Sequence, residues 1–254
     1  TATSDAIKYA GLMPWYIDID FNTWNSHVKD GIGVDLFGVP CDPDPPIMDA
    51  CESLGAELDN KKCGTLGKYN CLSFFANKPI TTGGEGGTLI VSNSKDAESA
   101  RRMRSHGRLF GDKYHSWPAF GYRMTEIQAA FGIAQMELLD DIIEAKKMIH
   151  NTYLDELGDS VIFQQYMPRS KPSWYFNCVK FKSKRSKNKI QKVMQRKDIE
   201  CREVFPPPKY HTPPWNEPCP NSEELYKHGL ILPSGPLLSI EHIKKISRII
   251  LENL

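Results

Sequence analysis

Short strand-like runs alternate with helical segments in the first two thirds of the chain, and this alternation restricts the possible folds most. Runs of β-branched, aromatic and other apolar residues predict three strands, at residues 15–20, 71–75 and 88–91. After the third strand, Asn93 or Ser94 can cap a helix that runs to about His106, where Gly107 supplies the stop. Strands that alternate with helices indicate a layered α/β fold.

A long helix and a smaller unit follow. Thr125-Glu-Ile-Gln128 fits a capping box, and apolar residues at three- and four-residue steps predict one buried face: Ile127, Ala130, Phe131, Ala134, Leu138, Ile142 and Ala145. Beyond this helix, the pattern predicts an α+β unit with a strand at residues 174–181, a helix at 190–197 and a last helix with Ile240, Ile243, Ile246 and Ile250 on one side. We therefore predict two domains, residues 1–145 and 146–254.

The overall composition excludes several classes of protein. The net charge of the 254 residues is +1, so no basic field attracts nucleic acid. The longest apolar stretches are too short to cross a bilayer, and no secretory signal opens the chain. Seven cysteines are an odd number without a CxxC pair, which argues against a disulfide framework or a structural zinc site. We expect a cytoplasmic protein with free thiols, no metal, and no nucleic-acid or membrane partner.

Lys78 lies between an apolar run and a cluster of glycines, in Ser73-Phe-Phe-Ala-Asn-Lys78-Pro-Ile-Thr-Thr-Gly-Gly-Glu-Gly-Gly87. Apolar neighbours disfavour an ammonium group, and the neutral amine is a nucleophile towards carbonyls. Glycines have no Cβ and let the backbone approach a ligand closely. A carbonyl-bearing cofactor such as pyridoxal 5′-phosphate (PLP) would use both features. A P-loop does not fit, because its lysine follows the glycines.

Five motifs follow one another along the chain, and their order and spacing are typical of one enzyme family. They are Asp49-Ala-Cys-Glu-Ser-Leu-Gly-Ala56, Ser73-Phe-Phe-Ala-Asn-Lys78, Thr81-Thr-Gly-Gly-Glu-Gly-Gly87, Arg104-Ser-His-Gly107 and Gly121-Tyr-Arg-Met-Thr-Glu-Ile-Gln-Ala-Ala130. Together they resemble the DegT/DnrJ sugar aminotransferases, which are fold-type I PLP enzymes. The resemblance implies an α/β large domain with a mixed, mostly parallel sheet between helices, a smaller C-terminal α+β domain, and a homodimer.

The resemblance also implies the roles of four residues. Lys78 matches the lysine that bonds covalently to PLP, and Ser73 matches the serine that holds its phosphate. Asp49 matches the aspartate that pairs with the ring nitrogen, where a carboxylate keeps the nitrogen protonated. Glu52 falls where family members carry Gln or Glu near the 3′-oxygen. Less specific interpretations stay open, since Asp49 can cap a helix and Ser73 can be a small strand residue.

The implied activity is the transfer of an amino group from an amino acid, glutamate first, to a nucleotide-linked 4-keto-6-deoxyhexose, as in perosamine-type synthesis. Two alternatives stay open. One is a C3-keto sugar or an aminocyclitol as acceptor, and the other is a non-catalytic regulatory relative that keeps the fold. Some relatives carry histidine in place of the lysine and act as sugar dehydratases. Lys78 therefore favours transamination.

The chain departs from the family pattern in three respects. The family has a preceding segment with phosphate-binding backbone and an aromatic residue against the ring, which would lie before Thr1. A crossover between parallel strands needs about a dozen residues or more, and residues 37–49 can hardly supply one. Either residues of the family pattern are omitted between Asp20 and Leu36 and between Pro46 and Asp49, or the sheet is incomplete. We expect omitted residues, because the flanking motifs are intact. Gly121 stands where the family often has an asparagine that reaches the partner's phosphate site. We expect that contact to be absent or made by backbone.

Two further stretches allow more than one interpretation. The run from Lys180 to Lys192 carries seven positive charges, and we expect a solvated strand edge and loop, with a contact to a nucleotide diphosphate as the alternative. A proline-rich loop contains polar and aromatic residues that could line a sugar or base pocket or merely pack the loop: Tyr210, His211 and Trp215.

Overall fold

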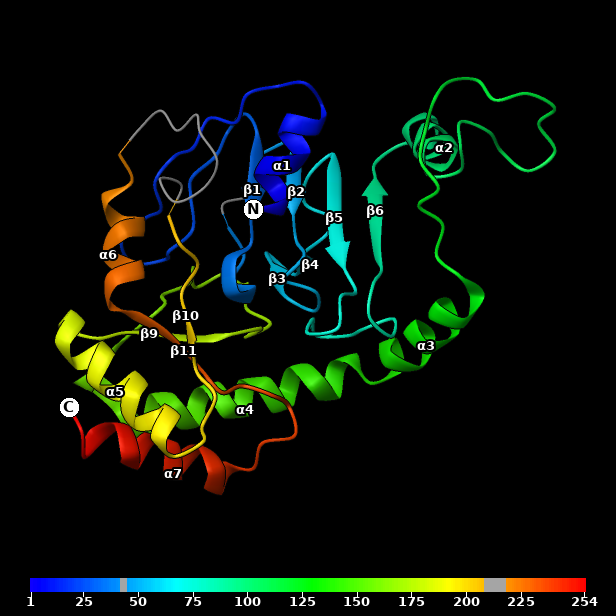
Figure 1. Ribbon diagram of the computed structural model, residues 1–254. Coiled ribbons are helices and arrows are strands. Elements are labelled where there is room, and N and C mark those ends of the chain that lie inside the picture. The colour runs from blue at the N-terminus through cyan, green and yellow to red at the C-terminus, as the bar shows by residue number, and fades with distance from the viewer. Residues whose placement is uncertain (42–44, 208–217) are drawn as a thin grey trace.

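The central element of the computed structural model, which describes residues 1–41, 45–207 and 218–254, is a four-stranded sheet (Figure 1). Its strands follow the order β1 (Ile32–Val34), β2 (Ile47–Asp49), β5 (Tyr69–Ser73) and β6 (Gly87–Val91). The pairs β1–β2 and β2–β5 are parallel, and β6 runs antiparallel to β5. The predicted mixed, mostly parallel sheet is therefore confirmed. Helix α1 (Ala2–Tyr9) lies over β1 and β2 in the view of Figure 1.

The strand predicted at residues 15–20 is wrong, whereas the other two correspond to β5 and β6. Residues 12–20 belong to no helix or strand. The Asp18 carboxylate instead accepts the backbone N–H groups of Asn221 and Ser222, at 2.7 and 2.9 Å. These two residues lie in the first turn of helix α6 (Pro220–His228), so the side chain of Asp18 caps this helix.

The connection between β1 and β2 is short. Residues 35–46 link these two adjacent parallel strands. Within the described part of this connection the only helical element is the 3₁₀ turn Leu36–Gly38, where Phe37 adopts φ 62°. The omission of residues of the family pattern from this region stays a prediction.

The C-terminal part of the chain forms the predicted smaller α+β arrangement. An antiparallel sheet has the order β10 (Arg202–Glu203), β11 (Gly229–Leu232), β9 (Asn177–Lys180) and β7 (Ile162–Phe163). Helices α5 (Lys184–Arg196) and α7 (Ile240–Leu251) pack with it around a shared apolar core. Ile243, Ile246 and Ile250 are buried in this core, as predicted, whereas Ile240 is 37% exposed. A third, short sheet pairs β4 (Lys61–Lys62), β3 (Glu57–Leu58) and β8 (Ser170–Lys171).

The long helix predicted after Thr125 is two helices, α3 (Glu126–Glu137) and α4 (Leu139–Leu157). The capping box at Thr125 and Gln128 is confirmed. The predicted buried face is wrong for α3, because Ile127 and Phe131 are 84% and 49% exposed. The buried positions lie further along, on α4, which ends in the C-terminal core. The domain boundary near residue 145 falls inside α4 and stays a prediction. Helix α2 (Ser94–Met103) begins after its predicted cap, Asn93, and ends before His106.

The run from Lys180 to Lys192 is not the solvated strand edge and loop that its charge predicts. Most of it forms α5, and Lys180 and Lys187 are each only 4% exposed. The Lys180 amine lies 3.8 Å from the centroid of the Phe21 ring, and Lys187 pairs with Glu203. The aliphatic stems of these lysines pack while their amines find partners. Tyr210, His211 and Trp215 lie outside the described residues.

The structure also bears on metal and membrane binding. Within residues 1–41, 45–207 and 218–254, no helix is long and apolar enough to cross a membrane. The same residues contain no group of three or more His, Cys, Asp or Glu side chains that could hold a metal ion. All seven cysteines are free thiols.

Candidate active site

Asp49 and Ser73 lie on one face of the central sheet, at the carboxyl ends of adjacent strands. Asp49 pairs in register with Cys71 of β5, so their side chains share a face. Ser73 lies two residues beyond Cys71 and therefore belongs to the same face. The alternate residues Met48 and Leu72 are buried on the opposite face. Register alone thus brings two predicted cofactor ligands to the sheet edge where α/β proteins bind ligands.

Lys78 lies in the loop after β5, with its amine near Glu52. The Lys78 Nζ and Glu52 Oε1 atoms are 3.7 Å apart, and the two side chains are only 14% and 13% exposed. The other carboxylate oxygen of Glu52 accepts the backbone N–H of Phe37 at 2.8 Å. The backbone N–H of Lys78 donates to the backbone carbonyl of Phe75, and this bond fixes the turn that carries the lysine. The structure therefore brings Lys78 and Glu52 together.

Electrostatic effects connect these groups with Asp49. Burial raises the pKa of Glu52, while the Lys78 ammonium lowers it and the Asp49 carboxylate raises it again. Burial also raises the pKa of Cys51 far above its usual range, and the charge of Asp49 adds to this effect. Cys51 is therefore a neutral thiol and not a nucleophile. Asp49, Glu52 and Lys78 act on one another as parts of a single site.

Sequence reasoning missed two side chains that contact this site. Thr3, on α1, donates its hydroxyl to Asp49 Oδ2 at 2.6 Å. The Tyr175 ring centroid lies 4.8 Å from Lys78 Nζ, and the Tyr175 hydroxyl donates to Asn77 Oδ1 at 3.0 Å. Both residues are far along the chain from their partners, and no local motif indicates either contact. The apolar run at residues 174–181 predicted a strand but gave no sign that this ring reaches the lysine.

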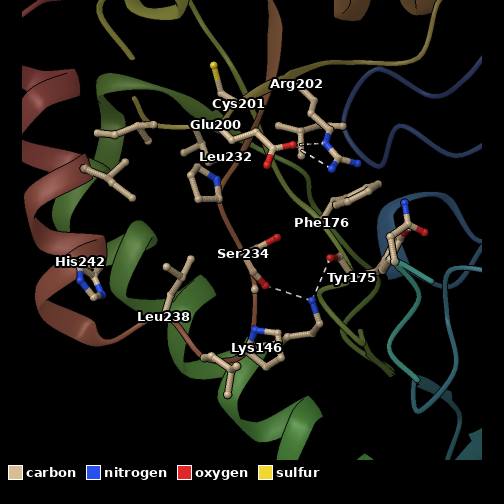
Figure 2. A pocket seen from close by; sticks show the side chains of 18 of the residues that line it. Lys146, Tyr175, Phe176, Glu200, Cys201, Arg202, Leu232, Ser234, Leu238 and His242 are labelled. Carbon is tan, nitrogen blue, oxygen red and sulfur yellow. Dashed lines mark hydrogen bonds and ion pairs between the residues drawn. The ribbon is translucent and has the colours of Figure 1, made fainter. Parts of the chain in front are cut away.

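A cavity of about 1100 Å³ includes Lys78 among its lining residues. It lies between α4, the segment that follows β11, and the start of α7, and Tyr175 and Phe176 form part of its wall. Lys146 of α4 points into this region, where its amine donates to the Tyr175 and Ser234 carbonyls, both at 3.1 Å (Figure 2). Lys78 thus lines a cavity of substrate size.

Gly121 is packed closely against His106. A Cβ atom at Gly121 would lie 3.0 Å from Cε1 of the His106 ring, so an asparagine here would require that ring to move. His106 itself adopts φ 56° and is exposed, and Ser105 forms a β-bridge with Gly121. Gly121 thus permits a local packing against His106 that a larger residue would disturb.

The residues of the site fit PLP in their chemistry. Lys78 would supply an amine for the aldehyde, Asp49 a carboxylate for the protonated ring nitrogen, and Ser73 a hydroxyl for the phosphate. Thr3 orients the Asp49 carboxylate by a hydrogen bond. The glycines after Lys78 add open backbone, since a Cβ at Gly83 or Gly84 would meet nothing within 4 Å. The donor set and its surroundings therefore match the cofactor.

The fold is that of the fold-type I PLP enzymes. Residues 45–251 match the DegT/DnrJ/EryC1/StrS aminotransferase family, and the chain belongs to that family. The resemblance inferred from the sequence is confirmed, and with it the fold class, the enzyme class and the cofactor. The protein is an aminotransferase that depends on PLP.

Individual relatives agree with this assignment. The GDP-perosamine synthase of Escherichia coli O157:H7 is 30% identical over 95% of this chain and 73% of its own length. A more distant relative from Acidithiobacillus ferrooxidans, named UDP-N-acetyl-3-dehydro-alpha-D-glucosamine 3-aminotransferase, is 23% identical over 98% of this chain and 74% of its own length. The crystal structure of a family aminotransferase from Brucella abortus superposes with a TM-score of 0.91, at 24% identity, over 99% of this chain and 76% of that one.

Proposed function

We propose that the protein transfers an amino group from an amino acid, glutamate first, to the 4-keto group of a nucleotide-linked 6-deoxyhexose. The observation that carries the proposal is the Lys78 amine, which lies 3.7 Å from Glu52 and borders a cavity of about 1100 Å³. The similarity to a GDP-perosamine synthase supports the acceptor and the carbon that is aminated. A lysine, not a histidine, at position 78 supports transamination over dehydration.

Each of the four site residues has a distinct role in this proposal. When bound, PLP supplies an aldehyde carbon and an electron-accepting ring. Lys78 would hold the cofactor through its amine, and its Nζ would accept and return the proton of the donor's Cα. Asp49 would keep the ring nitrogen protonated, and the hydroxyl of Thr3 fixes the orientation of its carboxylate. Ser73 would bind the phosphate, and Glu52, whose Oε1 lies 3.7 Å from Lys78 Nζ, would serve near the 3′-oxygen.

A second candidate is transfer to a 3-keto sugar. The relative from Acidithiobacillus ferrooxidans, named a 3-aminotransferase, aligns with 98% of this chain, which supports this alternative. The two candidates share all four site residues and differ only in which sugar carbon reaches the cofactor.

A panel of nucleotide-linked keto sugars, with glutamate as donor, tests the proposal. We expect mass spectrometry to detect an amino sugar from a 4-keto-6-deoxyhexose, and the yield to fall by about 10³-fold or more in Lys78→Ala. Lys61→Ala, at an exposed lysine of β4, is the matched control and should retain full activity. Amination of 3-keto sugars alone would favour the second candidate. A wild-type protein that stays colourless after incubation with PLP would contradict both.

We also propose that the protein is a homodimer. Its exposed face on α3 contains large apolar side chains, since Ile127 and Ile133 are 84% and 64% exposed. Phe120 and Tyr122 precede this helix, and their rings stack on each other while 59% and 72% exposed. Apolar surface gathered in one region is typical of subunit interfaces. A second copy of the chain is the occupant that the family resemblance supports.

A further inference from the structure

Tyr175 is a buried aromatic residue beside the reacting lysine, and the proposed function gives it no role. Its side chain is 2% exposed, and its ring centroid lies 4.8 Å from Lys78 Nζ. Its hydroxyl donates to Asn77 Oδ1 at 3.0 Å. Tyr175 therefore contacts both the lysine and the residue directly before it in the chain.

The chain around Tyr175 is held in place by several hydrogen bonds. The backbone N–H of Ser173 donates to the Gly38 carbonyl at 2.9 Å, and the Ser173 hydroxyl donates to the backbone carbonyl of Glu52 at 3.0 Å. The Lys146 amine donates to the Tyr175 carbonyl at 3.1 Å (Figure 2). A Cβ atom at Gly38 would lie 2.7 Å from the Tyr175 backbone nitrogen, so glycine permits this close approach. The ring therefore has little freedom to move away from the lysine.

Trp174, directly before Tyr175, adopts an unfavourable backbone conformation with φ 47°. A bulky residue rarely has a positive φ, and such strain persists only where the surrounding contacts determine it. Strained residues of this kind gather at functional sites. The strain at Trp174 thus lies next to the side chain that faces Lys78.

The Lys78 amine has two partners of different kinds, the Glu52 carboxylate, 3.7 Å from Nζ, and the ring of Tyr175. The face of an aromatic ring attracts an ammonium group within about 6 Å of its centroid, and more strongly where water is excluded. Because the Lys78 side chain is only 14% exposed, water is largely excluded here. Burial, together with the charge of Glu52, raises the pKa of the Tyr175 hydroxyl well above its usual range. The phenol therefore stays protonated, and it is not an acid or a base of the reaction.

We propose that Tyr175 is a positioning residue, whose ring holds the Lys78 amine inside the site whenever that amine is not bonded to the cofactor. This inference rests on the proposed function, in which the same amine holds the cofactor and moves a proton. An amine with both tasks must stay in place between them, whereas the four-carbon stem of a lysine is flexible. The Tyr175 ring and the Glu52 carboxylate together restrict that freedom.

Acetylation of the full chain before PLP is added tests the proposal. The reagent attacks neutral, accessible amines, and mass spectrometry measures the rate at each lysine separately. We expect Tyr175→Leu to accelerate acetylation of Lys78 about tenfold, the effect of losing one desolvated cation–π contact. Tyr175→Phe keeps the ring and should stay within about threefold of the wild type. Lys187, a buried lysine of α5 that pairs with Glu203, is the internal control and should react at the same rate in every variant.

Fluorinated phenylalanines at position 175 separate the attraction of the ring from its packing. Each fluorine atom weakens the negative potential of the ring face, while the shape of the ring changes little. Acetylation of Lys78 should therefore accelerate with the number of fluorine atoms, by about threefold or more for three of them relative to Tyr175→Phe. Because the ring is kept, this series also decides the question if Tyr175→Leu does not fold.

Three results would overturn the proposal: an unchanged rate at Lys78 in Tyr175→Leu, an acceleration that Lys187 shares, or rates at Lys78 that do not depend on fluorination. The measurement needs neither cofactor nor substrate. A failure of the proposed function, recorded as the absence of an amino sugar from the PLP-loaded wild type, is therefore distinguished from a failure of this contact.

Discussion

At the scale of single residues, Glu52 joins the active-site lysine to the turn that precedes the second strand. One of its carboxylate oxygens lies 3.7 Å from Lys78 Nζ, and the other accepts the N–H of Phe37, which is held at φ 62° in the 3₁₀ turn. A buried carboxylate with two partners therefore fixes both the lysine and an unusual backbone conformation. Replacing it should have separable effects on stability and on cofactor chemistry.

Glu52→Leu should lower the free energy of unfolding by about 1–3 kcal/mol, because the buried Phe37 N–H loses its acceptor. Glu52→Gln keeps an amide oxygen at the same position and should cost less. Urea unfolding of the two variants under reducing conditions measures the difference. Equal losses in both would mean that the charge near Lys78, and not the hydrogen bond to Phe37, is the main contribution.

Lys146 should make the stability of the protein depend on pH in the alkaline range. Burial lowers its pKa from 10.5 to about 8, so between these values the unfolded chain binds more protons than the folded one. Through Lys146, the free energy of unfolding therefore increases as the pH rises from about 8 to 10.5. In Lys146→Met this contribution disappears, and denaturation at several pH values should show a shallower slope than in the wild type. The same dependence of the free energy of unfolding on pH in the wild type and in Lys146→Met would contradict a lowered pKa of Lys146.

The residues of the site differ in how far the sequence predicts them. Lys78, Ser73, Asp49 and Glu52 stand in short motifs whose spacing is a local property, and the structure brings Lys78, Asp49 and Glu52 into electrostatic contact. Thr3, Tyr175 and Lys146 reach the site only through tertiary packing. The Tyr175 hydroxyl bonds to Asn77, 98 positions away, and no pattern in a single sequence specifies such a contact.

At the scale of secondary structure elements, residues 12–20 show how a pattern can fit two outcomes. Alternation of apolar and polar residues favours a strand, but a strand also needs a partner, and the sequence does not specify one. The side chain of Asp18 bonds to the first turn of α6 instead. For the same reason, the spacing of the apolar residues in α3 predicts the helix correctly but its buried face wrongly. Whether that face is buried depends on what packs against it.

Asp18→Ala should destabilise the protein by about 1–2 kcal/mol, because the first turn of α6 loses its carboxylate acceptor. Asp18→Asn keeps an oxygen acceptor without the charge and should lose roughly half as much. Thermal unfolding followed by circular dichroism measures both variants. No change in Asp18→Ala would indicate that water satisfies the N–H groups of Asn221 and Ser222.

At the scale of the whole molecule, the exposed apolar face of α3 is the feature that a single copy leaves unexplained. Ile127→Glu places a charge at its most exposed position, 84% accessible, and should shift the proposed dimer to monomer with a dissociation constant raised by about 10²-fold. Sedimentation velocity measures the change. Leu251→Glu, at a 40% exposed position on α7, serves as the control and should leave the dimer intact. A monomeric wild-type protein would contradict the proposal.

Helix α4 has a thermodynamic consequence for the molecule. Leu139 and Ile142, in its first turn, pack against the core of the first sheet, whereas Ile149 and Tyr153 belong to the core of the C-terminal part. Unfolding of either core would remove contacts that stabilise α4. Because α4 also packs in the other core, that core would be destabilised in turn. The two halves should therefore unfold cooperatively, and calorimetry should record one heat-absorption peak whose van't Hoff and calorimetric enthalpies agree. The helix that crosses the predicted boundary thus makes one folding unit of two cores.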